Sequence, residues 1–134
     1  MSASIEDVKI LLKRAVDLKA SDLHLTVGCP PIIRVNRKLK TLDGYEQFAP
    51  QDIQEIVYEL LSEPQKERFE REKELDISIH IYEISRFRVN VHMQRGCVEA
   101  SFRIIPFEIQ DMESLKLPPI VADFARRKSG LILV

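Results

Sequence analysis

Two neighbouring stretches of the sequence, residues 86–93 and 97–104, alternate strictly between polar and apolar side chains. Such a two-residue period is typical of β-strands with one face buried in a core and the other exposed. Arg95-Gly96 lies between the stretches and can form a two-residue turn, because Gly accepts a positive φ. The pattern predicts an antiparallel hairpin whose core face pairs Phe87 with Ile104, Val89 with Phe102, and Val91 with Ala100.

The opposite face of this hairpin gathers positive charge. The predicted register places Arg88 directly across from Arg103, with Arg86 two residues away, and two facing arginines repel each other in isolation. Arginine is suited to planar, bidentate capture of phosphate or carboxylate, so this face is predicted to meet an anion. Two alternatives stay open on the residues alone. The arginines could point into solvent or pair with acids such as Glu99, and a bulge at the turn would shift the register. The same register pairs Asn90 with Ser101 and His92 with Glu99.

The remaining periodicities predict a mixture of helices and short strands. Apolar residues at helical spacing predict helices over about residues 5–19, 50–61, 63–73 and 120–128. Alternation predicts strands over residues 23–27, 32–35, 39–42 and 75–80, with a second hairpin around Asn36-Arg37-Lys38. This mixed order predicts an α+β domain built on a mostly antiparallel sheet flanked by helices.

Composition narrows the class of protein. With 134 residues, 45% hydrophobic and 31% charged, the chain has the make-up of one globular domain. The net charge of −1 provides no basic field, so nucleic acid is not expected as a partner. No apolar stretch approaches the roughly 20 residues that cross a bilayer, and the first residues do not have the layout of a signal peptide. Cys29 and Cys97 have no metal-ligand spacing and fit reduced thiols, which favours a cytoplasmic protein.

The sequence holds no complete catalytic site. It contains no phosphate-binding glycine loop, no nucleophile elbow and no pair of carboxylates with a supporting base. His80 and His92 lack acidic or cysteine partners at ligand spacing, so no metal site is expected. His24 is expected to make a structural hydrogen bond near a helix end. The acids around the strand at 75–80 are expected to be solvated rather than catalytic; they are Glu72, Glu74 and Asp76.

The last residues, 128–134, read as a turn followed by a wholly apolar strand that begins at Gly130. Continuous apolar strands are typical of parallel sheets buried on both faces, and their backbone needs neighbouring strands. We therefore expect a first domain over residues 1–117. Residues 118–134 are expected to form a linker helix and the first strand of a further domain. The segment from Ile120 onward is expected to be disordered or to dock on a neighbouring molecule.

Four segments resemble, in order, a known family: Ala20-Ser21-Asp22-Leu23-His24-Leu25, Pro31-Ile32-Ile33-Arg34-Val35-Asn36, Ser85-Arg86-Phe87-Arg88-Val89-Asn90 and Ser101-Phe102-Arg103-Ile104-Ile105-Pro106. They resemble the N-terminal domain of the PilT-like type IV pilus retraction ATPases, in the type II/IV secretion ATPase superfamily. The resemblance covers essentially the whole chain. In that family, the strand that corresponds to Gly130–Val134 leads into the Walker A loop. One departure is Arg37, where the family commonly has Gly.

The resemblance implies a PAS-like domain joined by a flexible linker to a RecA-like ATPase core, with six subunits in a ring. It implies a motor that hydrolyses ATP with Mg²⁺ to power pilus retraction and twitching motility. Such a motor works in the cytoplasm, at the inner-membrane base of the pilus machine and against its platform protein. Arg88 and Arg103, with Arg86 as a further candidate, match arginines that reach the nucleotide phosphates. This chain alone is expected to be inactive and to hold no cofactor. The alternative is a free-standing PAS-like sensor or adaptor that binds a protein or small ligand.

Overall fold

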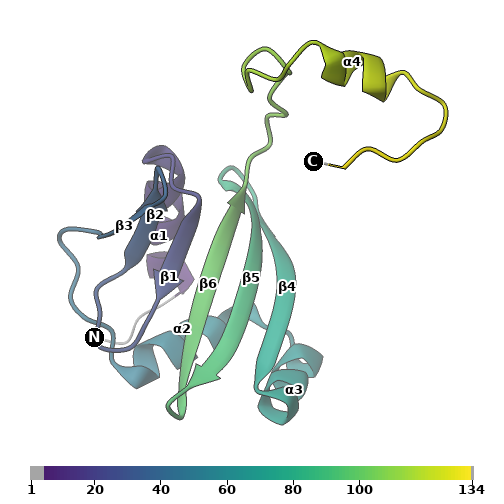
Figure 1. Ribbon diagram of the computed structural model, residues 1–134. Coiled ribbons are helices and arrows are strands. Elements are labelled where there is room, and N and C mark those ends of the chain that lie inside the picture. Colours follow the sequence, from purple (N-terminus) through teal and green to yellow (C-terminus); the bar gives the residue numbers. More distant parts are fainter. Residues whose placement is uncertain (1–4, 134) are drawn as a thin grey trace.

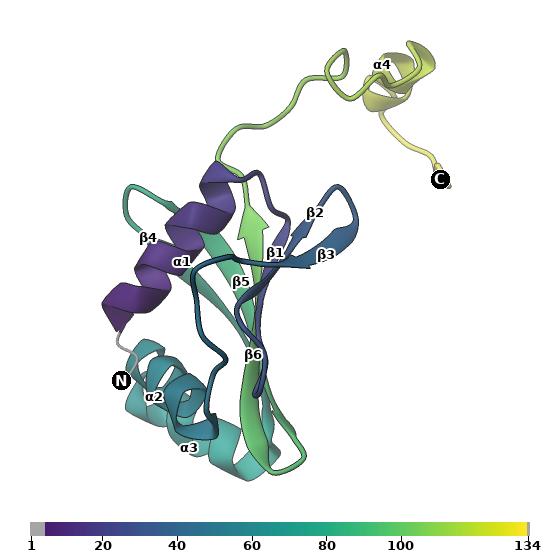
Figure 2. The same cartoon turned by 90° about the vertical axis from the view of Figure 1, so that its left-hand side faces the viewer.

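The computed structural model describes residues 5–133 and contains one antiparallel sheet with helices on one of its faces (Figures 1 and 2). The elements in chain order are α1 (Ile5–Asp17), β1 (Asp22–Leu25), β2 (Ile32–Val35), β3 (Lys38–Thr41), α2 (Pro50–Leu60), α3 (Glu63–Glu72), β4 (Glu74–Ile81), β5 (Ser85–Gln94), β6 (Cys97–Ile105) and α4 (Ile120–Ala125). The six strands are ordered β3-β2-β1-β6-β5-β4. The predicted α+β class is confirmed.

The core lies between the sheet and helices α1, α2 and α3. Apolar side chains on one face of β1, β5 and β6 are fully buried there, among them Leu23, Phe87 and Phe102. Because side chains alternate along a strand, burial of Phe87 and Phe102 forces the neighbouring Arg88 and Arg103 onto the open face. The burial of the apolar side chains thus fixes the position of the polar side chains that alternate with them along β5 and β6.

The predicted register of the long hairpin is confirmed pair by pair. Arg88 faces Arg103 across β5 and β6, and no bulge interrupts the ladder. The turn consists of Arg95 and Gly96 alone, with φ values of 52° and 79°. Two central residues with positive φ are typical of the type I′ turns that match the twist of a hairpin.

The second hairpin has a tighter turn than the sequence predicted. Val35 pairs with Lys38, so Asn36 and Arg37 form the whole turn and β3 begins one residue earlier. Their φ values are 49° and 67°. Asn tolerates this left-handed region, whereas Arg37 adopts it at a steric cost.

Three predicted elements extend beyond the ends that the structure gives them. Helix α1 ends at Asp17, and Lys19 has a positive φ of 54° that a helix cannot accommodate. Strand β1 ends at Leu25 rather than at residue 27, and α4 ends at Ala125 rather than at residue 128.

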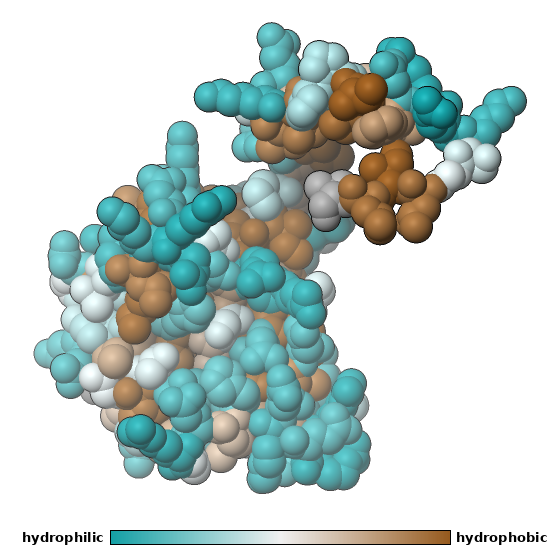
Figure 3. Space-filling view, in the orientation of Figure 1, coloured by the Kyte–Doolittle hydropathy of each residue, from teal (hydrophilic) through white to brown (hydrophobic). Residues whose placement is uncertain are grey.

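Residues 130–133 form no strand in this structure, Val134 lies outside the described residues, and the prediction that this segment begins a further domain stays a prediction. Leu131, Ile132 and Leu133 are exposed and pair with no strand of residues 5–133. The reason is the lack of neighbouring backbone, without which an apolar run cannot form a ladder. The segment after β6 leads away from the sheet, and apolar side chains gather on its surface (Figure 3).

No helix within residues 5–133 is long and apolar enough to cross a membrane. Both cysteines, Cys29 and Cys97, are free thiols.

Candidate functional site

The open face of the sheet carries a polar groove of about 320 Å³ across β1, β4, β5 and β6. The two arginines singled out in the sequence, Arg88 and Arg103, both line it. Their side chains are 60% and 67% exposed, so both guanidinium groups are accessible to a ligand. Asn90 and Ser101 face each other two residues along from the arginine pair, and both line the groove between the arginines and the hairpin turn.

Asp76 of β4 holds Arg88 through two hydrogen bonds. Arg88 donates from Nε to Oδ1 at 3.1 Å and from Nη2 to Oδ2 at 2.7 Å. Such a bidentate pair fits the flat guanidinium edge to a carboxylate. The hydrogen bond from Arg88 lowers the pKa of Asp76, and the same bond raises the pKa of Arg88. Both groups are therefore charged at neutral pH.

Asp22 of β1 holds Arg103 on the other side of the groove. Arg103 Nε donates to Oδ1 at 3.3 Å, while Oδ2 lies 3.3 Å from Arg34 Nε and accepts a hydrogen bond from Ser21 Oγ at 2.8 Å. Burial alone would raise the pKa of Asp22, but the hydrogen bonds from Ser21 and Arg103 outweigh it and the pKa is lowered. One largely buried carboxylate thus binds two arginines, because β1 runs between β2 and β6.

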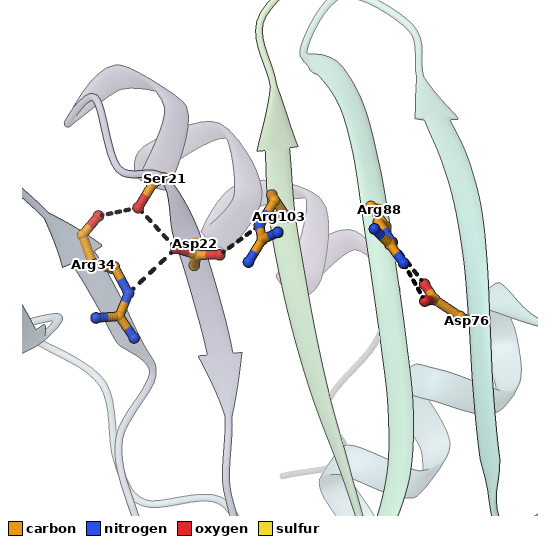
Figure 4. A network of polar contacts seen from close by, with 6 residues as sticks. All are labelled: Ser21, Asp22, Arg34, Asp76, Arg88 and Arg103. Atoms are coloured by element: carbon orange, nitrogen blue, oxygen red, sulfur yellow. Dashed lines mark hydrogen bonds and ion pairs between the residues drawn. The ribbon is translucent and has the colours of Figure 1, made fainter. Parts of the chain in front are cut away.

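The two facing arginines diverge (Figure 4). The guanidinium of Arg103 leans towards Asp22 and that of Arg88 leans towards Asp76. The alternative in which the arginines pair with acids is therefore the one that this structure adopts. The acids are Asp22 and Asp76 rather than Glu99, which lies 3.7 Å from His92 Nε2.

Arg86 stands apart from this network. It is exposed and lies across from Ile105 on β6 and His80 on β4. Within residues 5–133 its side chain makes no hydrogen bond or ion pair. Arg88 and Arg103, in contrast, are each held by an aspartate.

The structural hydrogen bond predicted for His24 is absent. Its Nε2 is buried in the groove and has no hydrogen-bond partner among the described residues. Burial lowers the pKa of His24, although nearby Asp22 partly opposes this shift. His24 is therefore neutral at pH 7, and its Nε2 is a buried polar atom without a partner among the described residues.

Sequence reasoning missed three members of the network, Asp22, Arg34 and Asp76. Asp76, Glu72 and Glu74 are all exposed, as expected. None of them is unpaired, however, because Asp76 binds Arg88, Glu72 binds Arg68, and Glu74 accepts a hydrogen bond from Asn90. A signal for Asp76 was present, because its parity in Leu75-Asp76-Ile77 places it on the open face.

No group of three or more His, Cys, Asp or Glu side chains within residues 5–133 could hold a metal ion. The His80 ring instead stacks on Tyr82 with centroids 4.8 Å apart.

No family model matches the chain. The similar proteins and the similar solved structure described next are all pilus ATPases or pilus motors. The chain is 31% identical over 128 residues to the type IV pilus retractation ATPase PilT of Pseudomonas aeruginosa, covering 96% of this chain and 37% of that protein. It is 33% identical over 123 residues to the type IV pilus ATPase PilU of the same organism, covering 92% and 32%. The crystal structure of the pilus retraction motor PilT with bound ADP superimposes with a TM-score of 0.74 at 37% identity, covering 87% of this chain and 34% of that one.

The homologues over most of this chain are thus PilT and PilU type IV pilus ATPases, and the fold is that of the N-terminal domain of PilT. The chain spans about a third of the length of the relatives it matches.

Proposed function

We propose that this chain, as a homologue of the PilT and PilU ATPases, is the N-terminal regulatory and oligomerisation domain of a hexameric motor that powers type IV pilus retraction. The domain comprises residues 1–117, and residues 118–134 lead into an ATPase core. The motor acts in the cytoplasm at the inner-membrane base of the pilus machine, against its platform protein. The names of the relatives and the match to a retraction motor with bound ADP support this proposal.

The observation that carries the proposal is the pair of exposed arginines that face each other on the open side of the sheet. Arg88 and Arg103 supply positive charge to the phosphates of ATP, with Arg86 as a further candidate. Guanidinium groups stabilise the charge that spreads over the oxygens of a transferring phosphoryl group. Burial of Phe87 and Phe102 directly behind these positions gives the two arginines a rigid base.

Domain closure would convert binding at this face into motion. When the arginine face approaches a nucleotide, the contacts formed with its phosphates favour the closed arrangement of domains over the open one. A ligand can shift such an equilibrium only by its difference in affinity for the two states. The arginines provide that difference, since they reach the phosphates in the closed state alone.

In nucleotide-binding sites, Mg²⁺ is held by one or two protein oxygen ligands together with the phosphates, next to the phosphate loop. We therefore assign its ligands to the ATPase core, together with the lysine and backbone amides of a phosphate loop. The free-standing sensor or adaptor is the less favoured function, because homologues over most of the chain are ATPases.

The simplest test is to read the gene beyond the codon for Val134. The proposal expects, within about 10 residues, a glycine-rich loop that ends in Lys-Ser or Lys-Thr. The complete protein should then sediment as a hexamer in the presence of ATP. A stop codon directly after Val134 would contradict the proposal and favour an adaptor.

A further inference from the structure

Four residues from four adjacent strands form a single row across the open face. Asp22 of β1 lies directly between Arg34 of β2 and Arg103 of β6, and Arg103 in turn faces Arg88 of β5. The only like charges that meet in this row are Arg103 and Arg88. Directly opposed like charges are destabilising, so this contact needs compensation from its surroundings.

The compensation comes from the two sides of the groove and leaves a space between the arginines. Asp22 draws Arg103 towards β1, and Asp76 draws Arg88 towards β4 (Figure 4). The lining of the groove thus contains two arginines and two aspartates, so that its formal charge is zero. An anion that enters between Arg88 and Arg103 meets guanidinium groups already engaged by carboxylates.

We propose that Asp22 and Asp76 are specificity-determining residues that hold Arg103 and Arg88 apart and thereby select a multivalent oxyanion, such as a phosphate chain, over a monocarboxylate. The identity of this ligand class rests on the proposed function. A monocarboxylate that binds Arg88 or Arg103 would only replace the aspartate carboxylate already paired with that arginine, so it gains no binding free energy from the exchange. A phosphate chain offers several oxygens and more than one negative charge, so it can accept hydrogen bonds from both arginines at once. The aspartates compete with any anion for the arginines, and this competition lowers the affinity for a monocarboxylate more than that for a phosphate chain.

The two aspartates differ in how exposed they are and in how many partners they bind besides their arginine. The Asp76 side chain is 45% exposed, whereas that of Asp22 is 12% exposed and is also bound by Ser21 and Arg34. Exposed ion pairs contribute little to stability, so the Asp76–Arg88 contact is the one that opens most easily. Asp76→Asn therefore removes the competitor without disturbing the core, and it is the primary variant. Asp22→Asn, with folding verified by circular dichroism, is the second.

The experiment is an NMR titration of the arginine Nε–Hε signals of the 134-residue chain, with sodium pyrophosphate and with sodium acetate at constant ionic strength. Wild-type protein should bind pyrophosphate weakly and show no saturable response to acetate. Asp76→Asn should lower the Kd for pyrophosphate by about tenfold, which is the effect of removing one nearby opposing charge. The same variant should bind acetate measurably.

Glu74→Gln is the matched control. It removes one negative charge from the same strand and the same face, but Glu74 contacts Asn90 and no arginine. Its Kd for pyrophosphate should stay within about twofold of wild type, because Arg88 and Arg103 keep their aspartate partners in this variant.

Three outcomes would overturn the inference. They are an unchanged Kd in Asp76→Asn, an equal gain in Glu74→Gln, and no pyrophosphate binding by any variant. The first two leave the arginines as phosphate ligands and remove only the role of the aspartates. The proposed function itself is tested separately, by the gene sequence beyond Val134 and by turnover of the complete protein.

Discussion

Arg88 and Arg103 face each other directly across β5 and β6, yet their guanidinium groups turn to opposite sides, one to Asp76 and the other to Asp22. Opposite charges on the flanking strands β1 and β4 offset the repulsion between the two arginines. The arrangement explains how the sheet tolerates paired arginines when no anion is bound. It also keeps both side chains next to the groove that an anion would enter.

The isolated 134-residue chain should have no ATPase activity. A phosphate loop with its lysine and the magnesium ligands is absent from its sequence, and two arginines on a sheet cannot replace them. Release of inorganic phosphate from ATP should equal the buffer blank. Turnover above the blank that disappears in Arg88→Ala would contradict this expectation.

Stability should depend on pH through His24. Burial lowers its pKa below the ordinary value of about 6.5, so the unfolded chain binds more protons between the lowered pKa and that value. The free energy of unfolding should therefore rise with pH through this window and level off above it. Urea unfolding at a series of pH values should show this slope, and His24→Gln should reduce it. His80→Gln, at an exposed position, is the control that should retain it, and a slope unchanged in His24→Gln would refute the assignment.

The β2–β3 turn should gain stability from glycine. Arg37 has a φ of 67°, which side chains with a Cβ adopt at a cost, so Arg37→Gly should raise the free energy of unfolding by roughly 0.5–1 kcal/mol. Gly96→Ala is the reciprocal test in the other hairpin, because a Cβ there meets nothing within 4 Å and only its φ of 79° is unfavourable. That variant should lose about 1–2 kcal/mol. Equal stabilities in urea unfolding would show that neither turn is strained.

Deleting residues 119–134 should leave the thermal midpoint nearly unchanged. Helix α4 buries none of its residues, and Leu131 and Leu133 are 82% and 85% exposed. Exposed apolar side chains favour association, so the same deletion should remove any self-association seen by sedimentation. A large fall in the midpoint would mean that this segment packs on its own domain, and the boundary at residue 117 would be misplaced.

The sequence was most informative where a local pattern and a turn signal agreed. Between residues 86 and 104, strict alternation and the Arg95-Gly96 turn predicted a register, with a bulge as the alternative, and the structure adopts the predicted register. Alternation along each strand sends Phe87 and Phe102 into the core and both arginines to the open face, and the two-residue turn places the arginines directly opposite each other. The paired arginines were therefore predictable before any tertiary contact was known.

The partner of Arg103 was not predictable, because it depends on which strand flanks the hairpin on the β6 side. Asp22 reaches Arg103 only because β1 pairs with β6 across about 80 residues of sequence, and no local pattern specifies that pairing. Asp22 also faces Arg34 of β2, and this second pairing brings Arg34 into the network. Arg88 meets Asp76 across the neighbouring strands β4 and β5, only 12 residues apart in sequence, whereas the register of β5 and β6 places Glu99 across from His92.

The account depends most on Arg88 and Arg103 acting on the phosphates of ATP, and the kcat for ATP hydrolysis by the complete motor tests this most directly. Arg88→Ala and Arg103→Ala should each lower kcat by about 10²-fold or more, with little change in thermal midpoint because both side chains lie off the core. Arg68→Ala is the control, since this exposed arginine of α3 pairs with Glu72 outside the groove. Wild-type kcat in both groove variants would contradict the account.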